Sequence, residues 1–436
     1  MSVSLSPRIL FISGELIAGD LALRLQSEGC AVKLFVDHPE QKQCLKGFIE
    51  RVDSWRDQLD WVGKDGLIVF DDVGYGKIQD ELRRQGFRVV GGSEGGDRLE
   101  KDRRFGQELL AECGMQTMPN YDFETPEAAI EFVKANPKAW VVKQNNHQSA
   151  LNYVGVLADG RDALSVLEIY AKNGVKNITL QERMSGVEVS INRYFNGNDW
   201  VGPSEITIEH KSLFNDNIGP KTGEMGNLMW YDKGDGKFFH ETIGRLKPYL
   251  KKIDFRGDID INCFINEDKV YPIEVTARFG CPITHSQSVM HISPWHEFLG
   301  AVADGKDYKL EHRDGYCIAL TLALPPFPYE GVLATEYSSE GLELLFSESL
   351  TEIEMENIHY EAIEKRIDGL KERFFVTHSI GYTVFITGFG ATVTDAQKNV
   401  YSLAKKIIIP KVFYRTDIGN SFLRQDKEML ERWGWI

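Results

Sequence analysis

Short apolar runs alternate with helical patterns over the first hundred residues. The runs Ile9–Ile12, Val32–Val36, Leu67–Phe70 and Val89–Val90 are separated by amphipathic stretches such as Asp20–Ser27. Apolar strands that alternate with helical segments are typical of βαβ units, in which crossover helices cover a parallel sheet. The pattern therefore predicts a doubly wound parallel-sheet domain at the start of the chain, over residues 1–97.

The rest of the chain changes pattern twice. Strand and helix signals between Pro119 and Gly186 predict a compact α+β insertion of the size of a lid, at about residues 117–186 of a central domain over 98–324. Residues 325–436 predict a C-terminal antiparallel α+β domain, so the expected fold class is α/β and α+β multidomain. Two helices are expected at particular places, one over Asp97–Cys113 and one that opens at Thr394, where Gln397 completes a capping box.

Composition narrows the class of function. The chain has 436 residues with 50 Lys and Arg against 65 Asp and Glu, a formal charge of −15. An acidic surface repels phosphate backbones, which disfavours a nucleic-acid partner. The six cysteines form no CxxC pair, and the longest apolar stretch, Cys317–Leu324, is far shorter than the ~20 residues that span a bilayer. We expect a cytoplasmic protein without a membrane partner.

The most informative stretch is a predicted β-hairpin. Two alternating runs, Gly257–Ile265 and Val270–Gly280, flank a polar turn. With the turn centred near Glu267 and Asp268, Asn262 lies within about one residue of the position opposite Glu274. Side chains alternate with a period of two along a strand, so polar residues gather on one face. These residues are Asp258, Asp260 and Asn262 on the first strand, and Glu274, Thr276 and Arg278 on the second.

Oxygen ligands grouped in this way suit Mg²⁺, with Mn²⁺ as the alternative ion, because Mg²⁺ combines one or two carboxylates with phosphates and water. Arg278 beside them is suited to neutralise charge on a transferred phosphoryl group. The competing interpretation is the solvated face of an antiparallel sheet with cross-strand ion pairs.

Three further features each have a plain structural alternative. The glycine-rich turn Gly219–Gly226 can present backbone amides to an anion, or be only a turn. Lys143 ends an apolar strand, where it reaches a phosphate or only solvent. The segment Leu180–Glu188 leaves the predicted lid and re-enters the core, a position typical either of a nucleotide-binding slot or of a plain connector. No GxGxxG, P-loop or HExxH motif is present in the sequence.

The order of these pieces resembles the ATP-grasp superfamily and, within it, the glycinamide ribonucleotide synthetases, also called phosphoribosylamine-glycine ligases. The resemblance rests on Lys143, on the run Gly219-Pro220-Lys221-Thr222-Gly223-Glu224-Met225-Gly226, and on Ile273-Glu274-Val275-Thr276-Ala277-Arg278-Phe279-Gly280. It continues through Tyr414-Arg415-Thr416-Asp417-Ile418-Gly419 and covers nearly the whole chain. It implies an ATP- and Mg²⁺-dependent ligase that joins a carboxylate to an amine through an acyl phosphate. A homodimer is a family-level expectation.

The resemblance also implies roles for individual residues. Lys143 and Arg103, which replaces a family lysine, would hold the ATP phosphates. Glu188 would face the ribose, Glu274 would bind Mg²⁺ together with Asn262 or Thr276, and Arg278 would stabilise the transferring phosphoryl group. The adenine slot would be lined by Glu182, Arg183 and Met184. The substrate-binding residues would be Asp71, Asp72, Lys221, Thr222, Gly223, Glu224 and Arg415.

Departures from the family pattern bear on the substrate. The lid loop Asn145–Asn152 has no glycine, and Thr276 replaces a family asparagine. Asp71 and Asp72 replace a proline-containing loop, and Glu224 replaces a family glycine. Added carboxylates disfavour a phosphorylated amine, so we expect a substrate pair different from phosphoribosylamine and glycine. The alternatives are a true phosphoribosylamine-glycine ligase and a catalytically decayed nucleotide-binding module.

Overall fold

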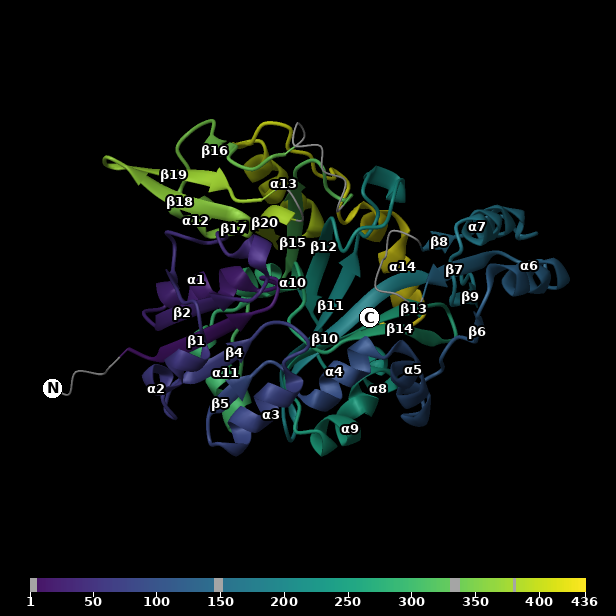
Figure 1. Cartoon of the computed structure of the whole chain (residues 1–436), viewed down its shortest axis with the longest axis horizontal. Helices are drawn as coiled ribbons and strands as arrows, with labels where there is room; N and C mark the ends of the chain where they lie inside the picture. The colour runs from purple at the N-terminus through teal and green to yellow at the C-terminus, as the bar shows by residue number, and fades with distance from the viewer. Residues whose placement is uncertain (1–5, 145–151, 330–337, 379–381) are drawn as a thin grey trace.

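The structure is a computed structural model that describes residues 6–144, 152–329, 338–378 and 382–436. Most of the lid loop, residues 145–151, therefore lies outside the described residues. Four sheets are present in the described residues, and Figure 1 shows the large central sheet in the middle of the molecule, with the N-terminal segment beside it and the C-terminal sheet above the N-terminal segment. The expected multidomain mixture of α/β and α+β parts is confirmed. No described helix is long and apolar enough to span a bilayer.

The N-terminal segment forms a five-stranded parallel sheet in the order β3-β2-β1-β4-β5. The four predicted strands are all present, because their apolar side chains are buried under helices on both faces. The strands are β1 (Arg8–Ser13), β2 (Ala31–Val36), β3 (Glu50–Arg51), β4 (Leu67–Phe70) and β5 (Arg88–Val90), and the helices are α1 (Gly19–Ser27), α2 (Leu59–Val62) and α3 (Gly76–Arg84).

The helix predicted over Asp97–Cys113 is wrong as a single helix. The chain forms α4 (Glu94–Lys101) and α5 (Arg103–Glu112), which are separated at Asp102. Asp102 has non-helical backbone angles, and its side chain accepts a hydrogen bond from the backbone N–H of Phe105. An aspartate placed there caps the second helix and so interrupts the periodic pattern.

The lid has a hydrophobic core of its own. Its four-stranded sheet has the order β6-β9-β7-β8 and is covered by two helices. Trp140, Val142, Leu167 and Leu180 belong to a buried cluster that is separate from the main core. In Figure 1 the lid projects to one side of the central sheet. Its elements are β6 (Asn120–Phe123), α6 (Pro126–Ala135), β7 (Trp140–Gln144), β8 (Tyr153–Val154), α7 (Arg161–Lys172) and β9 (Ile178–Glu182).

The central sheet is antiparallel, with the order β14-β13-β10-β11-β12-β15-β20-β17. Its strands are β10 (Val187–Asn196), β11 (Trp200–Glu209), β12 (Gly226–Tyr231), β13 (Arg256–Ile265), β14 (Val270–Thr276), β15 (Tyr316–Ala323), β17 (Ile358–Tyr360) and β20 (Tyr382–Gly390). β20 pairs with β15 and so joins the C-terminal segment to this sheet. The proposed division at residue 324 therefore falls within one hydrogen-bonded sheet, and the domain limits stay predictions.

The C-terminal segment adds a smaller antiparallel sheet, β18-β19-β16-β21, and helix α13 (Val393–Ala404). The expected capping box at Thr394 is wrong, because Thr392 is the N-cap and its hydroxyl accepts from the Asp395 N–H. Gln397 instead donates to the Ile418 carbonyl. The remaining elements are α8 (Lys237–Glu241), α9 (Lys247–Lys252), α10 (Ile283–Met290), α11 (Trp295–Asp304), β16 (Glu343–Phe346), α12 (Glu352–Glu356), β18 (Ile363–Asp368), β19 (Lys371–Val376), β21 (Ile407–Ile408) and α14 (Lys427–Arg432).

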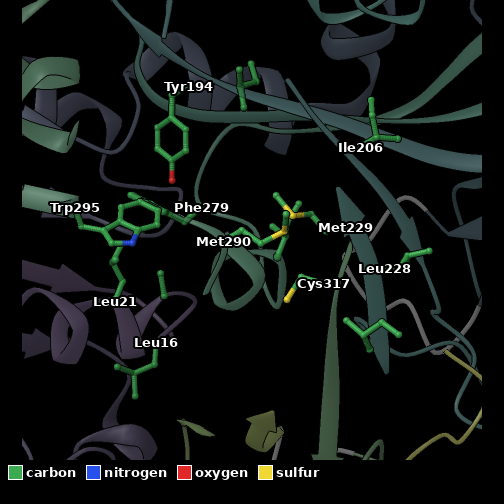
Figure 2. Close-up of a cluster of buried hydrophobic side chains, with 14 of the residues drawn as sticks. Leu16, Leu21, Tyr194, Ile206, Leu228, Met229, Phe279, Met290, Trp295 and Cys317 are labelled. Atoms are coloured by element: carbon green, nitrogen blue, oxygen red, sulfur yellow. The ribbon is translucent and has the colours of Figure 1, made fainter. Parts of the chain in front are cut away.

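One buried cluster joins all segments except the lid. Figure 2 shows Leu16 and Leu21 of the N-terminal segment close to Trp295, and Met290 beside Met229 of the central sheet. Helices α10 and α11 supply these central contacts, since they pack between the N-terminal helix α1 and the sheet. Continuous burial of apolar surface fixes the N-terminal segment against the central sheet.

The closest backbone approach between these segments requires glycine. The Gly91 N–H donates to the Arg256 carbonyl, and a Cβ on Gly257 would lie 2.9 Å from the Gly91 carbonyl carbon. We expect Gly257→Ala to lower the free energy of unfolding by about 1–3 kcal/mol, because neither backbone can move without breaking pairing. Urea denaturation measures the loss. Gly234→Ala is the control, since nothing lies within 4 Å of its added Cβ, and equal losses in the two variants would contradict the prediction.

Candidate active site

Four neighbouring strands of the central sheet place polar side chains on one face. Asn262 of β13 pairs with Glu274 of β14 and with Ser190 of β10, while Asp260 pairs with Asn192. Directly paired residues share a face of the sheet. The predicted hairpin register, with Asn262 opposite Glu274, is therefore confirmed.

The ammonium group of Lys211, just beyond β11, lies among three carboxylates of this face. Its Nζ is 2.8 Å from Glu274 Oε1, 2.9 Å from Glu209 Oε2 and 3.6 Å from Glu188 Oε1. Although burial opposes it, these carboxylates raise the pKa of Lys211 well above its usual value. In turn Lys211 lowers the pKa of Glu274 to about 2. Lys211 and Glu274 are therefore both ionised at neutral pH.

The same cluster offers hard oxygen ligands. The side-chain amide of Asn262 donates to Glu188 Oε1 at 2.9 Å and to Glu209 Oε2 at 3.3 Å. Its Oδ1 is buried, and none of the described residues donates a hydrogen bond to it. A buried carbonyl oxygen without a donor, opposite an ionised glutamate, fits a divalent cation such as Mg²⁺. Asn262 and Glu274, two of the three predicted metal ligands, could hold that ion; Thr276 is the third, and Glu188 adjoins them.

Arg278 is held from the N-terminal side by two acidic residues. Its Nε lies 3.2 Å from Glu100 Oε1 and 3.6 Å from Asp72 Oδ1, and Nη1 donates to the Phe279 carbonyl. Burial raises the pKa of both Asp72 and Glu100, and the positive charge of Arg278 offsets this rise only in part. Arg278 therefore bridges the N-terminal segment and the hairpin, with its position fixed before any ligand binds.

The predicted phosphate-binding residues lie beside the Lys211 cluster. Lys143 donates to Gln181 Oε1 at 2.8 Å. Burial, and then the charge of Arg103, lowers the pKa of Lys143 to about 8, while Glu274 and Glu188 act in the opposite direction. An amine partly deprived of water, next to a second cation, gains stability from an added anion. Lys143 and Arg103 are thus brought together where phosphates are expected.

The predicted adenine residues lie at the exit from the lid. Glu182 forms an ion pair with Lys138 at 2.8 Å, and Arg183 Nη1 donates to the Gly155 carbonyl at 3.2 Å. Met184 is half-buried in the connection to β10. The backbone N–H of Arg183 is bonded to the Ala139 carbonyl. The segment from Glu182 to Met184 therefore connects the lid to the central sheet, which is the position predicted for the adenine slot.

A pocket of about 450 Å³ opens over the polar face, between the N-terminal, central and C-terminal segments. Its only full cations in the described part of the chain are Lys211 and Arg278, and both are paired with carboxylates. Eight acidic residues line it, namely Glu15, Glu40, Glu209, Glu224, Asp258, Asp260, Glu274 and Glu361. The pocket lining is therefore predominantly acidic, although burial raises the pKa of Glu224, Asp260 and Glu361 well above the usual value.

The predicted substrate residues divide into three groups. Gly223 and Glu224 line the pocket, and Thr222 donates to the Lys211 carbonyl just behind it. Asp71 is fully buried and accepts hydrogen bonds from Ser13 Oγ and the Ala18 N–H, next to Asp72.

The third group is Lys221 and Arg415, which, like Thr222, Asp71 and Asp72, are not among the residues that line the pocket. Lys221 is exposed near Glu188; partial burial of its ammonium group lowers its pKa, although the charge of Glu188 acts in the opposite direction. Arg415 is only 1% exposed and forms a bidentate pair with Asp417 at 2.7 and 2.8 Å. The structure thus places its guanidinium in internal contacts.

Sequence reasoning missed several residues of this site. Lys211 and Glu209 continue the alternation of Glu205 and Thr207 along β11, a signal present in the sequence. Glu361 and Tyr382 carry no such signal, because they enter the pocket only through the pairing of β17 and β20.

Asp71 makes stability depend on pH in a defined direction. Burial, with Asp72 nearby, raises its pKa from 3.8 to about 7. Between pH 3.8 and pH 7 the folded state binds more protons than the unfolded state. The stability that protonated Asp71 contributes is therefore fully present below pH 3.8 and is lost as the pH rises through about 7. One group accounts for at most about 1.4 kcal/mol per pH unit.

We expect Asp71→Asn to flatten the fall in unfolding free energy between pH 5 and 7, as measured by urea denaturation at several pH values. Asp60→Asn, on the exposed surface, is the control and should retain the parental slope. An unchanged slope in Asp71→Asn would refute the assignment.

Sequence comparison matches residues 101–284 to the family described as phosphoribosylglycinamide synthetase, ATP-grasp (A) domain. The phosphoribosylamine–glycine ligase of Clostridium acetobutylicum is 25% identical over 360 residues, which cover 79% of this chain and 81% of the relative. The enzyme of that name from Caldanaerobacter subterraneus is also 25% identical, over 79% and 82% of the two chains.

Structural comparison agrees at the level of the fold. The phosphoribosylamine–glycine ligase of Thermotoga maritima superimposes with a TM-score of 0.67 at 20% identity, covering 94% of this chain and 100% of that one. Biotin carboxylase of Campylobacter jejuni gives 0.61 at 12% identity, over 98% and 97%. These matches confirm the predicted resemblance and the prediction of an ATP-grasp ligase. Residues 101–284 match an ATP-grasp domain, and the chain as a whole resembles the phosphoribosylglycinamide synthetases.

Proposed function

We propose that the protein is an ATP- and Mg²⁺-dependent carboxylate-amine ligase whose substrates differ from phosphoribosylamine and glycine. The observation that carries the proposal is the acidic lining of the pocket beside Glu274, Asn262 and Arg278, in which both full cations of the described lining are already paired. A phosphorylated amine would bring two negative charges toward eight acidic residues. A neutral or positively charged amine meets no such repulsion.

The proposed chemistry has two steps. A carboxylate oxygen of the substrate attacks the γ-phosphorus of ATP, the bond to the β-phosphate oxygen breaks, and ADP leaves. The amine nitrogen then attacks the acyl phosphate carbon, phosphate leaves with the bonding electrons, and the nitrogen loses a proton.

Each step has residues suited to it. Lys143 and Arg103 hold phosphate oxygens, and the exit strand at Glu182–Met184 lines the adenine. Mg²⁺, when held by Glu274 and Asn262, supplies positive charge at the phosphates. Arg278 is fixed by Glu100 and Asp72 at the pocket wall, and its remaining N–H groups offset charge on the transferring group.

A second candidate is the reaction that the curated relatives are named for. Four of them, each called phosphoribosylamine–glycine ligase, match 78–80% of this chain at 23–25% identity. Conserved length and order favour a shared reaction, whereas the buried Glu224 and Asp71 favour a different amine.

Trapping of the acyl phosphate separates the candidates. Purified protein is incubated with Mg-ATP, single amino acids and related acids, and hydroxylamine as a surrogate amine, with ADP and hydroxamate measured together. We expect a hydroxamate with one acid other than glycine. Efficient amide formation from glycine and phosphoribosylamine would refute the proposed difference in substrates. ATP binding without ADP release, with any acid, would favour the decayed nucleotide-binding module.

Arg278→Ala tests the phosphoryl-stabilising role. We expect turnover in the hydroxamate assay to fall by ~10²–10³-fold with little change in ATP affinity, because one preorganised donor is lost only from the transition state. Arg424→Ala, at an exposed ion pair with Asp216, is the matched control. Since Arg278 also pairs with Glu100, the unfolding midpoint of both variants is measured first. Parental turnover in folded Arg278→Ala would remove Arg278 from the mechanism.

A further inference from the structure

Two buried carboxylates in the pocket have no role in holding ATP or Mg²⁺. Glu224, just before β12, and Glu361, just after β17, are each 6% exposed and line the pocket. Among the described residues, none donates a hydrogen bond to Glu224 Oε1 or to Glu361 Oε2, although both atoms are buried. A buried acceptor that receives no hydrogen bond costs about 1–3 kcal/mol or more of stability. Each of these two oxygens therefore favours a hydrogen-bond donor from a ligand.

The two carboxylates surround the same pair of side chains. Cys281 and Tyr382 both line the pocket, and the charges of Glu224 and Glu361 act on both of them. The Tyr382 hydroxyl accepts a 2.6 Å hydrogen bond from the Glu224 N–H. A Cβ on Gly223 would lie 2.2 Å from that hydroxyl, so glycine is required for this contact. Glu224, Glu361 and Tyr382 therefore form one wall, which we call the carboxylate wall.

Within the described part of the chain, the cations near this wall do not balance its carboxylates completely. Burial raises the pKa of Glu361 well above its usual value, and Asp71 and Asp20 raise it further. For Glu224 burial and Glu209 act in the same direction, and Lys211 opposes them only in part. Lys211 itself is bound to Glu209 and Glu274. A positively charged ligand would relieve both carboxylates at once.

The surroundings favour an organic cation over a metal ion. An aromatic ring beside carboxylates is a typical environment for ammonium and guanidinium groups. Burial also raises the pKa of the Cys281 thiol well above its usual value, whereas a metal bound there would require a thiolate. A guanidinium or ammonium group offers several N–H donors, which matches two carboxylates with free oxygens.

We propose that the carboxylate wall is a subsite for a positively charged ammonium or guanidinium group of the amine substrate, distinct from the nitrogen that reacts. The inference rests on the proposed ligase function and names its substrate class, a diamine or a guanidino amine. The second charge is held at Glu224 and Glu361, while the reacting nitrogen faces the acyl phosphate beside Arg278.

The test measures binding without ATP turnover. Isothermal titration of the full chain compares putrescine and agmatine with 4-amino-1-butanol, which matches putrescine in length but has one charge fewer. We expect at least one of the two dications to bind tenfold or more tightly than the amino alcohol. This preference should fall at least tenfold in Glu224→Gln and in Glu361→Gln, and stay at the parental value in Glu356→Gln, an exposed residue outside the pocket.

Other outcomes overturn the proposal. Equal affinity of the parental protein for the dications and 4-amino-1-butanol contradicts it, even if neither glutamine variant folds. A preference that millimolar Mg²⁺ abolishes assigns the wall to a metal instead. The hydroxamate assay uses hydroxylamine and needs no second charge. Hydroxamate without selective dication binding therefore refutes only the subsite, whereas selective binding without hydroxamate or ADP refutes the ligase.

Discussion

The contact between the Lys211 ammonium and three carboxylates is the constraint on which the site depends. Without a cation, Glu188, Glu209 and Glu274 would repel one another on this partly buried sheet face, which would destabilise the arrangement. Lys211 sets the spacing of these groups, and through them the orientation of Asn262. The side-chain oxygens of Asn262 and Glu274, the ammonium group of Lys143 and the pocket all lie around that one ammonium group.

Arg278 has the corresponding role between segments. Its contacts with Glu100 and Asp72 connect the hairpin to the N-terminal segment, just as the approach of Gly91 to Gly257 does for the backbone. The pocket is therefore formed by three parts of the chain that are held in a fixed arrangement. The lid has a separate core around Trp140, and its Lys143 lies beside the Lys211 cluster.

How much the sequence predicts depends on the distance over which each contact is determined. The β13–β14 hairpin and its Asn262–Glu274 pair were predictable, because a short turn fixes the register of adjacent strands. The break at Asp102 was not, since a single cap residue overrode a continuous periodic pattern. Glu361 and Tyr382 could not be placed from the sequence either, because they reach the pocket only through the pairing of β17 with β20 and of β20 with β15. The inward direction of Lys211 was encoded in the alternation of β11, but its partners were not.

The pairing of β20 with β15 has an evolutionary consequence. Because the C-terminal segment completes the central sheet and contributes Tyr382 to the pocket, it cannot be exchanged as a module between relatives without rebuilding the sheet edge. Changes of substrate in this lineage are therefore expected to arise by point substitutions within the pocket, such as the glutamate at position 224, and not by recombination of whole segments.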